Sequence, residues 1–454
     1  MSSPTTLFVI PPEIIQHILA FCHPLGVSAF SRTCRAAYNV VYSPNDQYLW
    51  RELIIHHFDD PRKSLRCTTS SIPLCYDWKM ELQRRMMSSS IALNARGVSD
   101  DQLRFALETF ISIIDDASPI PRSQAVPSNG LRWLACLLHQ SRILYRQPPQ
   151  ELKQLVARLS VYFLFSDADE DEEYALISSG RRNESRCFAY DLRNYNMGNN
   201  WGPYLRDGSV NWLHVQHLMT VIWANLADLP ERWKNVRPSV GLEATRAFSA
   251  PDIASQRDWA GVEGTWRRYV CFMDYRFVVS LLSCIGILQN TASDLFSFNF
   301  SNVFRGPRNK AYFTENVRFR EATRLLEVKL RVVARDKLKF SNTDDDPAIC
   351  NPLYPPLFFH GISRGVDGNG SVIEGMVKMG NDGAARYKFS EKVSVHDGTT
   401  QWSSEGVQVG SVASAAGVVG AWTTSIHDQG DPVGPFWLWK VSDDFPTDAV
   451  VDYT

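Results

Sequence analysis

Apolar residues recur at helical spacing near the amino terminus. Pro12 and Glu13 suit the first turn of a helix, where the missing N–H is not needed and a negative charge meets the helix dipole. Further apolar stripes cover 27–41 and 49–54, so we expect three short helices. The first stripe is wider than one small partner helix can cover. It comprises Ile14, Ile15, Ile18, Leu19 and Cys22.

Helical spacing continues through the middle of the chain. Stripes of leucine and other apolar residues cover 103–114, 131–138, 152–162 and 215–226, and proline-rich breaks separate the first three. No fixed repeat period links them. We therefore expect a helical middle region over 61–245.

The pattern changes to alternation after Asp258. Leu326 to Val332 reads apolar at every second position, and Trp437 and Trp439 alternate in the same way, as in half-buried strands. Asn381–Gly383 and Asp397–Gly398 are hairpin-turn sequences. Many short strands with regular turns indicate a closed barrel or a sandwich. We favour an antiparallel barrel over 255–445, and the chain is predicted to be α+β. Four glycines are interpreted as bends or bulges: Gly406, Gly410, Gly417 and Gly420.

Composition narrows the class of protein. A chain of 454 residues corresponds to two or three domains, and its net charge of -2 argues against nucleic acid as the main partner. Its nine cysteines form no CxxC pair, which indicates neither a zinc site nor a disulfide framework and fits a reducing compartment. The segment before Leu7 carries no basic residue, so we expect no signal peptide, no membrane span, and a cytoplasmic or nuclear location.

Candidate catalytic and metal-ligating groups are few. For catalysis or metal binding, the side chains of His360, His396 and His427 would have to converge on one pocket. Asp428 and Asp431 are better explained as turn residues. The acidic run 167–173 lacks the glycine and glutamate spacing of an EF-hand loop. His214 and His217 lie one helical turn apart without a third ligand. We expect no enzyme activity, no cofactor and no metal.

The amino-terminal residues resemble the F-box. Ile10–Ile14 matches its L-P-x-E-[IL] opening apart from Ile10 in place of Leu, Ser31–Arg35 its second-helix signature, and Leu49–Leu53 its L-W-R-x-L ending. The resemblance covers Thr6 to Phe58, and the corresponding domain 6–60 is implied to dock on a Skp-family adaptor and, through it, a cullin. The implied adaptor-binding residues are Ile10, Pro11, Pro12, Glu13, Ile14, Ile18, Leu19, Phe30 and Trp50.

The carboxy-terminal region resembles the cyclin-binding β-domain of certain F-box proteins, on the segments 258–276 and 406–437. A protein substrate is then expected to bind an aromatic-rich surface. Four tryptophans are expected to fill the inside or one mouth of the barrel, and phenylalanines in the loop 290–310 are further candidates. These substrate-binding candidates are Trp259, Trp266, Trp402 and Trp422, with Phe296, Phe298 and Phe300.

The two resemblances imply the substrate-recognition subunit of a Skp–cullin–F-box ubiquitin ligase. One alternative is that the amino-terminal bundle packs on the rest of its own chain. A second is a barrel that carries or senses a small ligand and is tethered through an F-box. Gly264–Trp266 matches a short motif of lipocalin-like barrels and favours that alternative.

Overall fold

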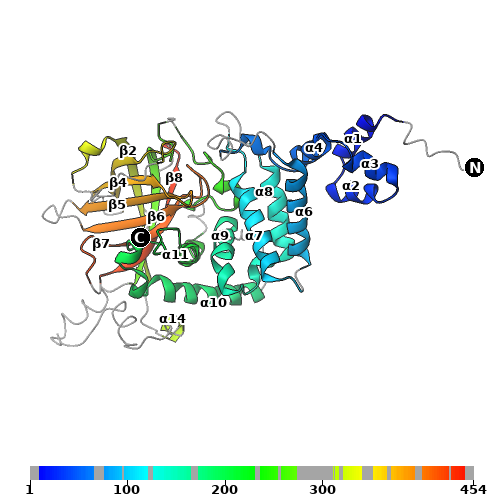
Figure 1. Ribbon diagram of the computed structural model, residues 1–454. Coiled ribbons are helices and arrows are strands. Elements are labelled where there is room, and N and C mark those ends of the chain that lie inside the picture. The colour runs from blue at the N-terminus through cyan, green and yellow to red at the C-terminus, as the bar shows by residue number, and fades with distance from the viewer. Residues whose placement is uncertain are drawn as a thin grey trace, which may run out of the picture. The chain divides into compact units, whose positions relative to one another are not determined.

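A computed structural model describes most of the chain (Figure 1). The described residues are 10–65, 76–94, 97–120, 126–164, 172–230, 236–253, 257–273, 310, 312–315, 321–339, 351–365, 370–393, 401–428 and 431–444. The chain forms two compact units, Met1–Leu159 and Ser160–Thr454. The division falls inside the predicted middle region, so the helices of that region are shared between the units.

The first unit is helical throughout its described part. Its elements alternate with short turns, in keeping with the predicted stripes. The helices are α1 (Pro12–Ala20), α2 (Pro24–Ser31), α3 (Arg35–Tyr42), α4 (Tyr48–His57), α6 (Trp78–Leu93), α7 (Asp100–Asp115), α8 (Asn129–Ser141) and the start of α9 (Lys153–Phe163).

The predicted helix over 27–41 is two helices, so the amino-terminal bundle has four helices among its described residues and not three. The chain leaves the helical conformation at Cys34, whose backbone is extended, and the Cys34 sulfur accepts the N–H of Ala37 at the start of α3. The Thr33 hydroxyl meanwhile bonds to the carbonyl of Phe30, which closes the preceding turn. Local side-chain bonds of this kind compete with helix continuation.

The bundle packs its inner side on α6. Ile15 of α1, Leu53 and Ile54 of α4, and Trp78 and Leu82 of α6 belong to one buried cluster. Asp59, just after α4, accepts hydrogen bonds from the Ser128 hydroxyl at 2.6 Å and from the N–H groups of Ser118 and Asn129. The alternative that the bundle packs on its own chain therefore holds for one of its faces.

The second unit is a barrel with helices on one side. Strand boundaries follow the predicted alternation, including the turn at Asn381–Gly383, where Gly383 has a φ of 77°. The elements are α10 (Glu172–Ala189), α11 (Trp212–Ala227), β1 (Gly264–Met273), α14 (Tyr312–Glu315), β2 (Glu321–Val333), β3 (Leu357–Arg364), β4 (Gly370–Met379), β5 (Ala385–Val393), β6 (Trp402–Gln408), β7 (Val418–Thr424) and β8 (Val433–Val441).

The eight strands close into an antiparallel barrel in chain order, with β1 paired to both β2 and β8 (Figure 1). Closure leaves no free sheet edge. The pairing register places the even-numbered residues of β1, such as Trp266 and Arg268, on the inside and the odd-numbered residues outside. Trp437 and Trp439 therefore share the outer face, where their rings make an edge contact at 6.4 Å.

Gly406 and Gly420 have a different role from the bends or bulges that the sequence predicted. They pair directly across β6 and β7, and both face the barrel interior. A Cβ atom at Gly406 would lie 2.8 Å from the Phe436 ring, which is too close. The two glycines thus make room for a buried phenylalanine. Gly410 and Gly417 lie in the β6–β7 turn with positive φ, as a turn requires.

Helix α11 covers the outer face of β7, β8 and β1. Trp223 of α11 meets Trp437 of β8 with ring centroids 6.2 Å apart. On the far side of α11, the Ser185 hydroxyl of α10 bonds to His217, and His214 bonds to the hydroxyl of Tyr195. The two histidines thus lie between α11 and the residues of α10 and the turn after it, where both rings also contact Phe188.

Candidate functional site

One side of α1 is apolar and exposed. Helical spacing places Ile14 and Ile18 together on one side of α1, next to the side formed by Ile15 and Leu19, which lie in the core. The exposed set continues into the turn before α2 and into α2 itself. We call it the α1 face: Ile10, Ile14, Ile18, Phe21 and Leu25, whose side chains are 37 to 64% exposed.

Two prolines fix the start of this helix. Pro11 is the amino-terminal cap, with φ -51° and ψ 137°, and Pro12 takes the first helical position. The N–H groups of Ile14 and Ile15 bond to the Pro11 carbonyl. Glu13 is exposed in the first turn. The extended backbone at Pro11 brings Ile10 to the beginning of the exposed stripe.

Histidines border the α1 face. His17 hydrogen-bonds the Tyr48 hydroxyl at 3.1 Å and meets the edge of Phe21, which also contacts His56. His23 caps α2 by accepting the N–H of Leu25. Burial, and then the nearby ring of His57, lower the pKa of His23 below its ordinary value. A neutral His23 keeps the end of the face free of formal charge at neutral pH.

The nine predicted adaptor-binding residues fall into two groups. Leu19 and Trp50 are buried in the bundle core, and Phe30 packs against that core, half-buried. These three support the α1 face from within and do not belong to its exposed surface. Six residues are exposed on or beside the face: Ile10, Pro11, Pro12, Glu13, Ile14 and Ile18. Phe21 and Leu25 were missed, although they continue the same apolar stripe.

The predicted aromatic filling of the barrel is confirmed for three tryptophans. The register places Trp266, Trp402 and Trp422 on the inner face of β1, β6 and β7. Trp402 and Trp422 make an edge contact at 5.2 Å, near the ends of β6 and β7. Trp259 precedes β1, where its indole N–H bonds to the Pro355 carbonyl at 2.7 Å.

The burial of these tryptophan rings limits the surface that they could offer to a substrate. Trp266 is 1% exposed, its indole N–H bonds to the Val262 carbonyl, and Trp259 and Trp422 are also buried. Only Trp402 of the four is half-buried. The rings therefore fill the barrel and present little surface to a substrate. Phe296, Phe298 and Phe300 lie outside the described residues, as does Phe304.

A buried ion pair occupies the middle of the barrel. Arg268 donates from Nη1 to Glu391 Oε2 and from Nη2 to Ser404 Oγ, each at 2.9 Å. The Ser371 hydroxyl bonds to the other oxygen of Glu391. The guanidinium also lies 5.1 and 5.2 Å from two aromatic rings, those of Phe389 and Phe436.

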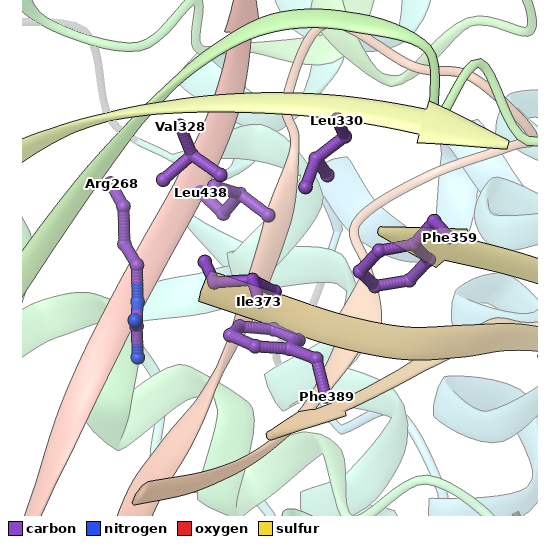
Figure 2. Close-up of a pocket in the computed structure, with 7 residues that line it drawn as sticks. All are labelled: Arg268, Val328, Leu330, Phe359, Ile373, Phe389 and Leu438. Carbon is purple, nitrogen blue, oxygen red and sulfur yellow. The ribbon is translucent and has the colours of Figure 1, made fainter. Parts of the chain in front are cut away.

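Little space remains beside this ion pair. Figure 2 shows Arg268 and six apolar side chains around one small cavity. The cavity measures about 10 Å³, which is the size of a single water molecule and far below what a small organic ligand needs. The other lining residues are Val328, Leu330, Phe359, Ile373, Phe389 and Leu438.

The candidate catalytic residues do not converge within the described part of the chain. His360 lies on the outer face of β3, while His427 stacks on Trp201 after β7, with ring centroids 3.9 Å apart. His396 lies outside the described residues. Asp431 accepts the N–H of Asp428 at 2.7 Å, in agreement with its interpretation as a turn residue.

Among the described residues, no set of three or more His, Cys, Asp or Glu side chains is arranged to hold a metal ion. None of the described helices has both the length and the apolar character needed to cross a membrane. Comparison with known proteins adds no relative: no family model, no curated protein and no solved structure matches this chain.

Proposed function

We propose that this protein is the substrate-recognition subunit of a Skp–cullin–F-box ubiquitin ligase and works in the cytoplasm or nucleus. The α1 face is the observation that carries the proposal. It would dock on the Skp-family adaptor and, through it, the cullin. The carboxy-terminal unit would hold a protein target, so that the conjugating enzyme meets a lysine of that target.

The energetics of the α1 face favour a partner. Half-exposed isoleucines gain on the order of 1 kcal/mol each when a protein covers them, since burying a whole side chain contributes about 1.5–3 kcal/mol. Ile14 and Ile18 lie one turn apart on the same side of α1, and Phe21 extends that side. Contiguous exposed apolar residues of this kind are typical of interaction sites.

The sequence signature supports the same proposal from an independent direction. The exposed residues Ile10 to Ile14 are the ones that match the F-box opening, and the prolines that this opening requires cap the helix.

The barrel would serve recognition without chemistry of its own. Trp266 and Trp422 are buried inside it, and the space beside Arg268 is about 10 Å³. The part of that interior which the structure describes gives no support to the small-ligand carrier. A protein target would then meet the outer surface or the loops of the barrel.

Direct capture tests the proposal. The full-length protein, immobilised, should retain a purified Skp-family adaptor, and the adaptor should bring a cullin with it. Replacing Ile14→Ser and Ile18→Ser should weaken adaptor binding roughly thirtyfold, because about 2 kcal/mol of apolar burial is lost.

A matched control lies in the same unit. Met80 and Met87 of α6 are 64 and 57% exposed and lie outside the α1 face. Met80→Ser with Met87→Ser should leave adaptor binding unchanged. Absence of adaptor binding by the folded wild-type protein, or equal losses in both double variants, would refute the proposal.

A further inference from the structure

The outer face of β2 and β3 carries a cluster of positive charge. Register pairs Lys329 with Ile362 and Arg331 with His360, and all four residues lie on the outside of the barrel. Arg364 follows two positions after Ile362 on the same face of β3. We call Lys329, Arg331, Arg364 and the central Ile362 the basic face.

The side chains of the basic face are open to solvent. Lys329 is 62% and Ile362 42% exposed, and Arg331 and Arg364 are exposed as well. An exposed apolar side chain among cations can bury itself only in a partner that also meets those cations.

One buried carboxylate is shared between several cations of this region. Glu327 binds Arg267 at 2.9 Å, forms a longer ion pair with Lys329 at 3.7 Å, and lies opposite Arg364 in the strand register. Among the described residues, no carboxylate forms an ion pair with Arg331 or Arg364.

The positive charge continues beyond the end of β2. Arg335 lies over the ring of Phe358 on the same outer face, 5.9 Å from its centroid, and Lys337 follows, exposed. Glu374, on the next strand, is 1% exposed and accepts the N–H of Lys339. Asp336 is an exposed acid within this stretch. Among the described residues of this stretch, exposed cations outnumber exposed acids, on a chain whose net charge is -2.

We propose that the basic face binds an acidic polypeptide segment in which an apolar side chain covers Ile362. This names the class of target that the carboxy-terminal unit recruits, and its biological role rests on the proposed function. Acidic side chains would meet Lys329, Arg331 and Arg364. Because the barrel is closed, the segment would bind through side chains and not by adding a strand.

The choice of a polypeptide over nucleic acid follows from Ile362. A phosphate backbone would meet the cations and leave that side chain uncovered, whereas a peptide supplies both acidic and apolar groups. The overall negative charge of the protein also opposes a general attraction to nucleic acid.

Peptide titration tests the inference with the full-length protein alone. The probe is a short fluorescein-labelled peptide in which glutamates alternate with leucines, and its partner probe carries glutamine at every glutamate position. We expect the acidic probe to bind at least about tenfold more tightly, and its affinity to fall as salt is added. Because no adaptor is present, the result is independent of adaptor capture.

Charge reversal locates the site. Lys329→Glu with Arg331→Glu should weaken binding of the acidic probe by at least about tenfold. Arg132→Glu with Arg206→Glu changes the net charge by the same amount at exposed positions off the basic face, and should preserve binding. Thermal unfolding should confirm that both double variants are folded.

Several results would overturn the inference. Equal affinity for the acidic and glutamine probes would do so without any variant, and equal losses in the two double variants would show a general charge effect. Tighter binding of a short single-stranded oligonucleotide than of the acidic probe would assign the face to nucleic acid instead.

Discussion

Helix α1 and strand β1 are both rich in apolar residues, but they use them differently. In α1 one side packs in the core while Ile14 and Ile18 remain about half exposed. In β1 every residue from Thr265 to Met273 is buried, because the barrel interior takes one face and α11 contacts the strand from outside. A contiguous exposed apolar face, such as that of α1, indicates recognition, whereas apolar residues that the fold buries indicate stability.

The largest expected effect is the loss of stability when a buried side chain of β1 is removed. Trp266→Ala should lower the free energy of unfolding of the carboxy-terminal unit by about 3–5 kcal/mol, because it removes a fully buried ring and leaves a cavity. Denaturant unfolding followed by tryptophan fluorescence measures the loss. Adaptor binding should survive under conditions where this variant is folded. A loss below about 1 kcal/mol would mean that the ring is not part of the core.

Acid should weaken the same unit. Burial, followed by repulsion from His217, lowers the pKa of His214 to about 3, and burial lowers that of His217 to about 4. The unfolded chain therefore binds more protons than the folded chain between about pH 3 and pH 6.5, so stability rises with pH through this window and is constant above it.

Protonation of His214 in the unfolded chain should by itself lower the free energy of unfolding by roughly 2 kcal/mol at pH 5 relative to pH 7.5. His214→Gln removes the titrating group and should flatten this part of the pH dependence, although it lowers stability at neutral pH by removing a packed ring. Denaturant unfolding at several pH values measures the slope. An unchanged slope in the variant would assign the acid sensitivity to other groups.

The smallest expected effect is on the exposed side. Ile14→Ser with Ile18→Ser should change the free energy of unfolding of the amino-terminal unit by less than about 1 kcal/mol, since both side chains already contact water in the free protein. Urea unfolding of this double variant and of the methionine double variant measures the change. Destabilisation as large as that of Trp266→Ala would place the isoleucines in a core.

Sequence patterns predicted the type of most elements because burial imposes a period. The stripe that begins at Pro12 became α1, and the alternation at Leu326–Val332 became the inner face of β2. The carboxy-terminal barrel follows from the same alternation. The pairing of β1 with β8, which closes the barrel, could not be predicted from any local pattern, because the two strands are far apart in the chain.

Other features had no clear signal. Arg267 and Arg268 are adjacent and both buried, which a strand pattern does not predict. They are accommodated because Glu327 and Glu391, from two other strands, pair with them on opposite faces. Helix α10 was missed because its sequence is largely polar.

The sequence pattern also could not show which of the candidate site residues are exposed. The wide stripe of α1 predicted a docking helix, but it could not tell that Ile18 is exposed while Leu19 and Trp50 are buried. The tertiary packing of α4 and α6 decides which side is covered. On β2, Lys329 and Arg331 read as the ordinary polar half of a strand, and only the exposed Ile362 beside them marks the face as distinctive.

Hydrogen–deuterium exchange of the full-length protein, with and without a purified Skp-family adaptor, shows whether the adaptor covers the α1 face. We expect slower exchange in the presence of adaptor at the amides of α1 and α2, around Ile14, Ile18 and Leu25, and unchanged exchange in β1, β6 and β7. Slower exchange confined to the barrel strands, or no change at α1 and α2 at saturating adaptor, would contradict this expectation.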